Sequence, residues 1–171
     1  PFWIMLYAYK LSGDKKYFES ARRCADVLLS LQRRNGGWPD QWSFNGSSSG
    51  HSGVMRGVSF NDNATNSCVQ MMVAMYHMTA DKKYIARLSE LGRFVAKSKI
   101  GEGILVGWCE QYNDDGRPVR ARQYEIELPY PRALTRGVGP LLVWLYLMDN
   151  NEAHMDLLRR AYAWHEHVRQ E

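Results

Sequence analysis

The stretch Ser12-Gly13-Asp14-Lys15-Lys16-Tyr17 decides the fold, because it recurs in nearly the same form as Thr79-Ala80-Asp81-Lys82-Lys83-Tyr84. The two copies are 84 − 17 = 67 residues apart. Gly37-Trp38 recurs as Gly107-Trp108 after 108 − 38 = 70 residues, and a weaker third copy runs from Leu147-Met148-Asp149 into Leu157-Leu158-Arg159-Arg160-Ala161. Self-similarity at a fixed period indicates a fold built from stacked units.

Each unit contains an apolar stretch followed by an amphipathic one. The apolar stretches predict inner helices over residues 2–9, 64–78 and 138–148, because a helix that is apolar nearly all round must be surrounded by protein. The amphipathic stretches predict outer helices over residues 15–33, 82–97 and 151–169. We therefore expect an all-α fold, an (α/α)3 toroid or barrel of three helical hairpins.

Two long segments rich in Gly, Ser, Asn, Asp and Pro separate the hairpins, over residues 34–61 and 100–131. Both lead from an outer helix into the next inner helix, so we expect them to share one rim, with the short turns on the opposite rim. Loops of this length without structure of their own are usually functional or disordered. A functional site is therefore expected on the long-loop rim.

Composition favours one domain over residues 1–171, since a chain of 171 residues that is 45% hydrophobic can bury a sizeable core. Lys and Arg exceed Asp and Glu by only 22 − 18 = 4, far from the concentrated basic patches of nucleic-acid binders. No apolar stretch approaches the 20 or so residues that span a bilayer. We expect a monomer that binds neither nucleic acid nor membrane, trimmed from a longer chain because residue 1 already lies in an inner helix.

The cysteines of the chain do not indicate a functional site. The three cysteines, Cys24, Cys68 and Cys109, are odd in number and widely spaced, which favours neither disulfides nor zinc, and two of them fall on apolar helical faces.

Residues 59–66 place four Asn and Asp side chains close together at the start of the second inner helix. Asp62 or Asn63 could cap that helix, but one cap needs one residue. Such a crowd of hard oxygen ligands could also hold a cation or sugar hydroxyls.

Arginines gather near the same loops, at Arg120, Arg122, Arg132 and Arg136. A planar guanidinium is suited to grasping a carboxylate through two parallel hydrogen bonds. Each arginine could instead pair with a nearby Asp or Glu, so the cluster favours an acidic ligand without requiring one.

Several of these motifs together resemble family 10 pectate lyases. They are Asn35-Gly36-Gly37-Trp38-Pro39, Phe60-Asn61-Asp62 with Ala64, Trp108-Cys109, Gln111, and Pro118 with Ala121-Arg122 and Tyr124-Glu125. The resemblance implies a toroid of three helical hairpins that cleaves polygalacturonate by Ca2+-assisted β-elimination, in a secreted or periplasmic protein. It implies that Arg122 removes the C5 proton and that Asp62 helps bind Ca2+ or substrate. Asn113 departs from the family pattern, which usually has an aspartate there.

Further substrate contacts are expected around these two residues. They are Asn35, Trp38, Asp40, Asn61, Asn63, Trp108, Gln111, Arg120, Tyr124, Glu125 and Arg132. Arginine has a pKa above 12, so a base at Arg122 needs alkaline conditions or strong local charge.

Other functions stay open at this point. A glycoside hydrolase would need two facing carboxylic acids, which Asp62 with Glu110 or Glu125 could supply. A non-catalytic carbohydrate-binding or scaffold toroid would use the loop aromatics to stack on sugar rings. Gln32 with Gly36-Gly37-Trp38 resembles the repeats of terpene cyclases, but the chain lacks their Asp-x-Asp-Asp motif.

Overall fold

The computed structural model describes residues 1–40, 57–121, 123 and 125–169. These residues are mostly helical, as the sequence predicts. They form six α-helices, which are α1 (Phe2–Ser12), α2 (Lys15–Leu31), α3 (Ala64–Thr79), α4 (Leu88–Ser98), α5 (Gly139–Asp149) and α6 (Glu152–Val168). Shorter elements are the strands β1 (Val58–Ser59) and β2 (Gln111–Tyr112) and the helical turns η2 (Asn61–Asn63), η3 (Lys82–Tyr84) and η4 (Ala133–Val138).

The three short turns have one design, which explains why the sequence repeats. Each inner helix ends in a left-handed residue, Gly13, Ala80 or Asn150, whose N–H donates to a tyrosine carbonyl four positions earlier. The next residue, Asp14, Asp81 or Asn151, then caps the following helix by accepting a backbone N–H two positions later. A left-handed C-terminal residue followed by an Asx cap closes both helix ends within three residues. The third turn follows this design although its sequence differs.

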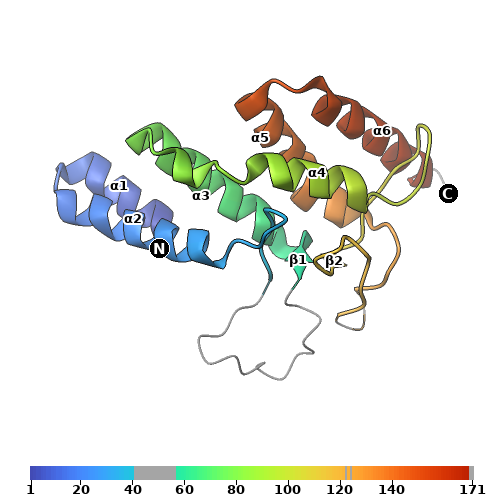
Figure 1. Cartoon of the computed structure of the whole chain (residues 1–171), viewed down its shortest axis with the longest axis horizontal. Helices are drawn as coiled ribbons and strands as arrows, with labels where there is room; N and C mark the ends of the chain where they lie inside the picture. The colour runs from blue at the N-terminus through green and yellow to red at the C-terminus, as the bar shows by residue number, and fades with distance from the viewer. Residues whose placement is uncertain (41–56, 122, 124, 170–171) are drawn as a thin grey trace.

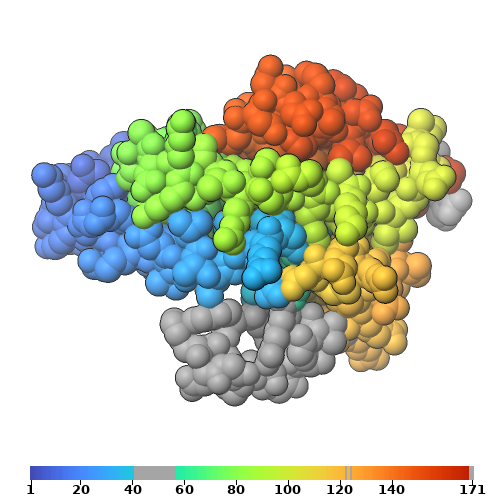
Figure 2. Space-filling view, viewed as in Figure 1, coloured from blue at the N-terminus to red at the C-terminus, as the bar shows by residue number. Residues whose placement is uncertain are grey.

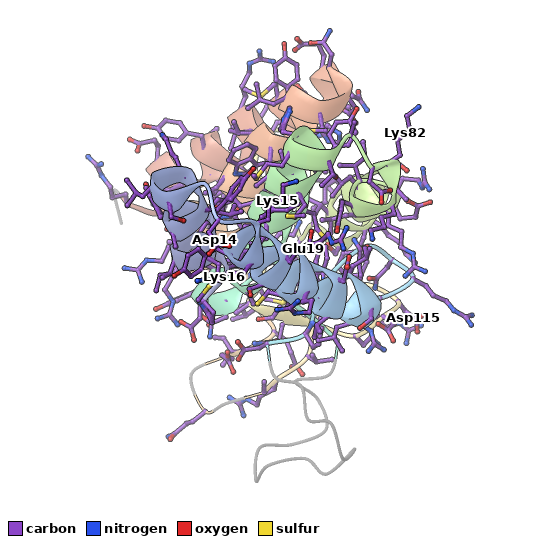
Figure 3. All side chains as sticks on the ribbon, turned by 90° about the vertical axis from the view of Figure 1, so that its left-hand side faces the viewer. Asp14, Lys15, Lys16, Glu19, Lys82 and Asp115 are labelled. Carbon is purple, nitrogen blue, oxygen red and sulfur yellow. The ribbon has the colours of Figure 1, made fainter. Side chains whose placement is uncertain are left out.

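Charged side chains flank these turns. Figure 3 views the molecule toward the α1–α2 turn and shows Asp14, Lys15 and Lys16 at the start of α2, with Lys82 projecting from the second turn. Lys16 pairs with Asp14 at 2.9 Å, and both side chains are largely exposed. The repeated lysines therefore lie in solvent, where such a pair contributes little to stability.

The three hairpins pack side by side, with helix α3 in the middle. α2 and α5 both contact α3, and α5 also contacts α4. The core is formed largely by α3, α4 and α5, with Met72, Leu91 and Leu141 fully buried. Figures 1 and 2 show the α1–α2 hairpin at one end of the molecule and the α5–α6 hairpin at the other.

Helix α1 differs from its prediction as a surrounded inner helix. Of its apolar residues, Trp3, Ile4, Tyr7 and Leu11 are 44%, 68%, 66% and 86% exposed, whereas Phe2 is buried. The physical reason is its place at the end of the row, where α2 is its main contact. These four exposed apolar residues, Trp3, Ile4, Tyr7 and Leu11, are here called the α1 face.

The two long loops meet on one rim, as the topology predicts. β1 belongs to the first loop and β2 to the second, and they pair antiparallel with Val58 opposite Tyr112 and Ser59 opposite Gln111. The Phe60 N–H extends this pairing by donating to the Glu110 carbonyl at 2.9 Å. This small ladder places the start of α3 beside the middle of the second loop.

Two helix boundaries differ from the prediction. The second outer helix begins as the short turn η3 and becomes α-helical only at Leu88, rather than running from residue 82. The third inner helix is preceded by η4, one stretch of π-helix over Ala133–Val138. Arg132 therefore directly precedes this helical element, and Arg136 lies within it.

The cysteines behave as core residues. Cys68 and Cys109 are buried and Cys24 packs against the core, all three with free thiols. Burial raises the pKa of the Cys68 thiol to about 12, so it is protonated and unreactive at neutral pH. Among the described helices, none has the length and apolarity that crossing a membrane requires.

Candidate active site

The Asn-Gly-Gly-Trp-Pro motif braces the first loop. The Trp38 indole N–H donates to the Leu28 carbonyl at 2.8 Å, and the Trp38 carbonyl accepts the Ser59 N–H at 2.9 Å and the Thr65 hydroxyl at 3.2 Å. Gly36 has φ +86°, and a Cβ there would lie 2.5 Å from the Arg87 carbonyl oxygen. The motif therefore ties α2 to β1 and α3.

Trp38 and Trp108, both predicted to contact substrate, lie in the interior. Trp38 is 2% exposed and Trp108 is 0% exposed. The Trp108 indole N–H donates to the Val95 carbonyl at 2.9 Å, so its polar atom is also satisfied. In this structure the two rings hold the loops in place and offer no face to a sugar.

The start of α3 has an unusual backbone. Asp62 and Asn63 are consecutive non-glycine residues with positive φ, +46° and +65°. The Asn63 side chain makes no capping hydrogen bond to α3, so the capping role considered for Asn63 is not borne out. The Asn63 side chain instead contacts Asn66 and Ser67. Left-handed backbone at non-glycine residues costs about 1–2 kcal/mol each, and such strain clusters at functional sites.

A buried amide–carboxylate network lies directly beneath Asp62. Glu125, 1% exposed, accepts the Asn61 amide at 2.7 Å and the Gln111 amide at 3.0 Å, both on Oε1. Asn61 also donates to Asp62 Oδ2 at 3.3 Å. The network joins the start of α3 to two points of the second loop, Gln111 and Glu125. Asn61, Gln111 and Glu125, predicted as substrate contacts, are thus brought together, but below the surface.

Asp62 itself is exposed, and charged groups surround it. Arg132 donates hydrogen bonds from Nε and Nη2 to Glu110 Oε1, at 2.9 and 2.8 Å. Glu110 is 2% exposed, and burial is the main cause that raises the pKa of its carboxyl, which the Arg132 guanidinium partly offsets. Asp62 and Glu125 are close enough to add to the rise. The site thus combines one exposed carboxylate, Asp62, with two buried ones and a half-buried arginine.

Beside this cluster, a second contact joins the loops. Arg33 donates through Nε and Nη2 to the two carboxylate oxygens of Asp114, and the Asn35 amide donates to the Asp114 carbonyl at 3.1 Å. Figure 2 shows residues near 35 in contact with residues near 115. A hollow of about 770 Å3 lies here, lined by Ser30, Leu31, Gln32, Arg33, Arg34, Asn35, Pro39 and Asp114.

The remaining predicted contacts are placed as follows. Asp40 is half-buried and Arg120 is exposed, and the Arg120 backbone N–H donates to Glu127 Oε1 at 3.3 Å. Arg122 and Tyr124 lie outside the described residues, so the predicted proximity of Arg122 to Asp62 stays a prediction.

A protein cage for a metal ion is not formed by the part of the chain that the structure describes, since no three His, Cys, Asp or Glu side chains converge there. Asp62 is exposed and carries a hard oxygen ligand, but Glu110 and Glu125 turn oxygens toward Arg132 and the amides. Ca2+ takes six to eight oxygen ligands. The described residues therefore do not fit a preformed calcium site.

Comparison with known proteins decides the family. The family model described as pectic acid lyase matches residues 3–171. The chain belongs to the pectic acid lyase family. Comparison with curated protein sequences finds no match.

Two solved structures support the fold of this family member. One is a mutant family 10 polysaccharide lyase from Cellvibrio cellulosa in complex with trigalacturonic acid, with a TM-score of 0.74, 20% identity, and coverage of 95% of this chain and 52% of that chain. The other is the family 10 polysaccharide lyase from the same organism, with a TM-score of 0.70, 20% identity, and coverage of 94% and 50%. The chain thus spans about half the length of these lyases.

Sequence reasoning missed the partners that hold the site. The sequence indicates Glu110 only as a possible hydrolase acid, and it does not mark Arg33 or Asp114 as site residues. A signal for Glu110 did exist, because an acidic residue beside Trp108-Cys109 in an otherwise buried run needs a cationic partner. Nothing local could have shown that Arg33 meets Asp114, since the contact joins different repeats.

Proposed function

We propose that this chain forms the uronate-binding part of a pectate lyase that cleaves polygalacturonate by β-elimination. The observation that carries the proposal is family membership over nearly the whole chain, joined to an exposed Asp62 and a half-buried Arg132 on one rim. An arginine beside an acidic residue suits a polymer that carries one carboxylate per sugar. The related lyase with bound trigalacturonic acid supports the substrate class.

Ca2+ would be held by Asp62 together with carboxylates of the substrate, since the described side chains form no cage of their own. A divalent ion on the uronate carboxylate stabilises the negative charge that develops when the C5 proton leaves. Asp62 would orient this assembly from the strained start of α3. Asp40, Asn35 and Arg120 stay proposed contacts farther along the rim.

Arg122 is the proposed base. Its guanidinium must be neutral to accept a proton, which free arginine is not at neutral pH. We therefore expect turnover to rise with pH into the alkaline range. A substitution Arg122→Lys should lower kcat and kcat/KM together and leave affinity largely intact, because lysine keeps the charge but not the planar fork. Near-normal kcat at every pH would remove Arg122 from this role.

We further propose that the three hairpins form part of an α/α toroid, and that the α1 face packs against further helices in a protein of the relatives' full length. Supporting this are the four exposed apolar residues of α1 and the coverage of only about half of the matched lyases. A polymer too large to enter a cell favours a secreted or periplasmic enzyme.

The test is direct. Polygalacturonate is added to the purified chain with Ca2+ or with a chelator, and absorbance of the unsaturated uronate product is followed. Absorbance that appears only with Ca2+, and is lost in Asp62→Ala, would support lyase activity. Products without a double bond would instead indicate a hydrolase.

A second candidate, a carbohydrate-binding module without catalysis, is favoured by one observation, the half-length coverage. Binding of trigalacturonate without any product would establish it. The hydrolase alternative is weaker, because Glu110 and Glu125 are buried and engaged by Arg132 and by two amides.

A further inference from the structure

Glu110 and Arg132 form an ion pair with one buried end and one surface end. Both guanidinium nitrogens in the pair, Nε and Nη2, donate to the same oxygen, Glu110 Oε1. The Glu110 side chain is 2% exposed, while the Arg132 side chain is 35% exposed. The Nε and Nη2 edge of the guanidinium is thus occupied by Glu110, while about a third of the Arg132 side chain stays exposed.

The other oxygen of Glu110, the buried Oε2, has no hydrogen-bond partner in the part of the chain that the structure describes. The neighbouring carboxylates of Asp62 and Glu125 make this position still less favourable for a negative charge. A buried carboxylate of this kind is costly, and replacing such a pair by neutral groups is often neutral or stabilising. Stability therefore does not explain why Glu110 is acidic.

Tyr130 limits the remaining freedom of Arg132. The Arg132 Cζ lies 5.5 Å from the centre of the Tyr130 ring, within the range of a cation–π contact. Arg132 also directly precedes η4, which packs against η2, the turn that contains Asp62. The guanidinium is fixed on its Nε and Nη2 edge by Glu110 and near one face by Tyr130, and its backbone is anchored beside the site.

We propose that Glu110 is a positioning residue, which aims the remaining edge of the Arg132 guanidinium at a carboxylate of the bound uronate polymer next to Asp62. A guanidinium binds a carboxylate best through two parallel N–H groups, so its orientation decides its affinity for the ligand. Glu110 fixes that orientation before the ligand arrives, which lowers the entropy lost on binding. This inference rests on the proposed function, because the ligand is the uronate.

The test is a double-mutant cycle read by calorimetry with trigalacturonate, using the parent chain, Glu110→Gln, Arg132→Met and the double variant. We expect Arg132→Met to weaken binding on the order of tenfold to a hundredfold. Glu110→Gln should weaken it about tenfold, because the amide holds Arg132 less firmly. In the double variant the loss should match that of Arg132→Met alone. The matched control is Glu102→Gln, an exposed acid of the same long loop, which should leave binding unchanged.

The outcomes separate the two claims. A parent chain that does not bind trigalacturonate contradicts the proposed function. A parent that binds, with Glu110→Gln indistinguishable from Glu102→Gln or with fully additive losses, overturns the positioning role alone. If Arg132→Met does not fold, because it leaves Glu110 buried and unpaired, Arg132→Lys replaces it in the cycle. Fully methyl-esterified trigalacturonate provides a further readout, since Glu110→Gln should leave its affinity unchanged.

Discussion

Arg33 and Asp114 lie 81 positions apart in the chain, yet the guanidinium of one donates to both carboxylate oxygens of the other. Asn35 adds a hydrogen bond to the Asp114 backbone. The pair joins the two long loops at a point separate from the β1–β2 ladder. A loop held at two points keeps its orientation, whereas one held at a single point can rotate.

Arg33→Met should lower the free energy of unfolding by about 1 kcal/mol, the upper range for a partly exposed pair with ideal fork geometry. Arg34→Met is the matched control, because Arg34 is exposed and lines the same hollow. It should change stability by less than about 0.5 kcal/mol. Urea unfolding of both variants measures the difference, and equal values would show that the pair contributes nothing.

The second turn contains a correctable strain. Ala80 has φ +56° at the position where the first turn has Gly13, at φ +71°. Ala80→Gly should therefore stabilise the chain by about 0.5–1 kcal/mol, and Gly13→Ala should destabilise it by about 1–2 kcal/mol. Thermal unfolding measures both changes in stability, which should have opposite signs. A loss of stability in Ala80→Gly would show that the cost at Ala80 is already relieved by its surroundings.

Asp62, at the candidate site, also has a positive φ that glycine would relieve. Asp62→Gly should stabilise the chain by about 0.5–1 kcal/mol by relieving the backbone at φ +46°, while abolishing the dependence of ligand binding on Ca2+. Asp81→Gly is the control, because Asp81 has ordinary backbone and caps η3. Its expected cost is a few tenths of a kcal/mol. A destabilised Asp62→Gly would mean that the side chain of Asp62 holds the rim together.

The buried Glu110 predicts a pH effect on stability. Its pKa is raised mainly by burial, so the native state takes up its proton at a higher pH than the unfolded chain does. A raised pKa contributes stability that is present at acid pH and is lost as pH rises through the native value. Glu110→Gln should therefore be more stable than the parent at pH 7, with a difference that shrinks toward pH 4. Chemical unfolding across this range tests it, and a difference that grows on acidification would contradict it.

The α1 face gives the last prediction. Leu11 is 86% exposed, so Leu11→Gln should change the stability of this chain by less than about 0.5 kcal/mol. Leu141, fully buried in α5, provides the contrast, and Leu141→Ala should cost about 2–5 kcal/mol. In a protein of the relatives' full length Leu11→Gln should become costly. Equal small effects in both lengths would leave the α1 face without a partner.

Sequence periodicity predicted the helices well because each depends on local signals. All six expected helices are present, and the third turn forms despite its weak likeness to the others, since Asn150 and Asn151 supply the same backbone chemistry as Gly13 and Asp14. The π-helix before α5 and the late start of α4 were missed, because both are set by packing between elements rather than by periodicity.

The site was predicted less completely, for a physical reason. The residue types in the two long loops located the rim. Whether a side chain there faces a ligand or holds the loops depends on its burial, which is set by the tertiary structure. Trp38 and Trp108 have the composition of sugar-stacking residues yet bond with their ring N–H groups to helix carbonyls. Gln111 and Glu125 likewise satisfy each other beneath the surface. Only the structure could separate the side chains that face a ligand from those that hold them.

The β1–β2 ladder also bears on how the molecule folds. Each hairpin closes through contacts only a few residues apart, so the three can form early and independently of one another. The ladder joins residues more than fifty positions apart, and closing so long a loop is entropically costly until the hairpins have docked. We expect the functional rim to be the last part to assemble, so that a chain with native helix content can still lack its ligand site.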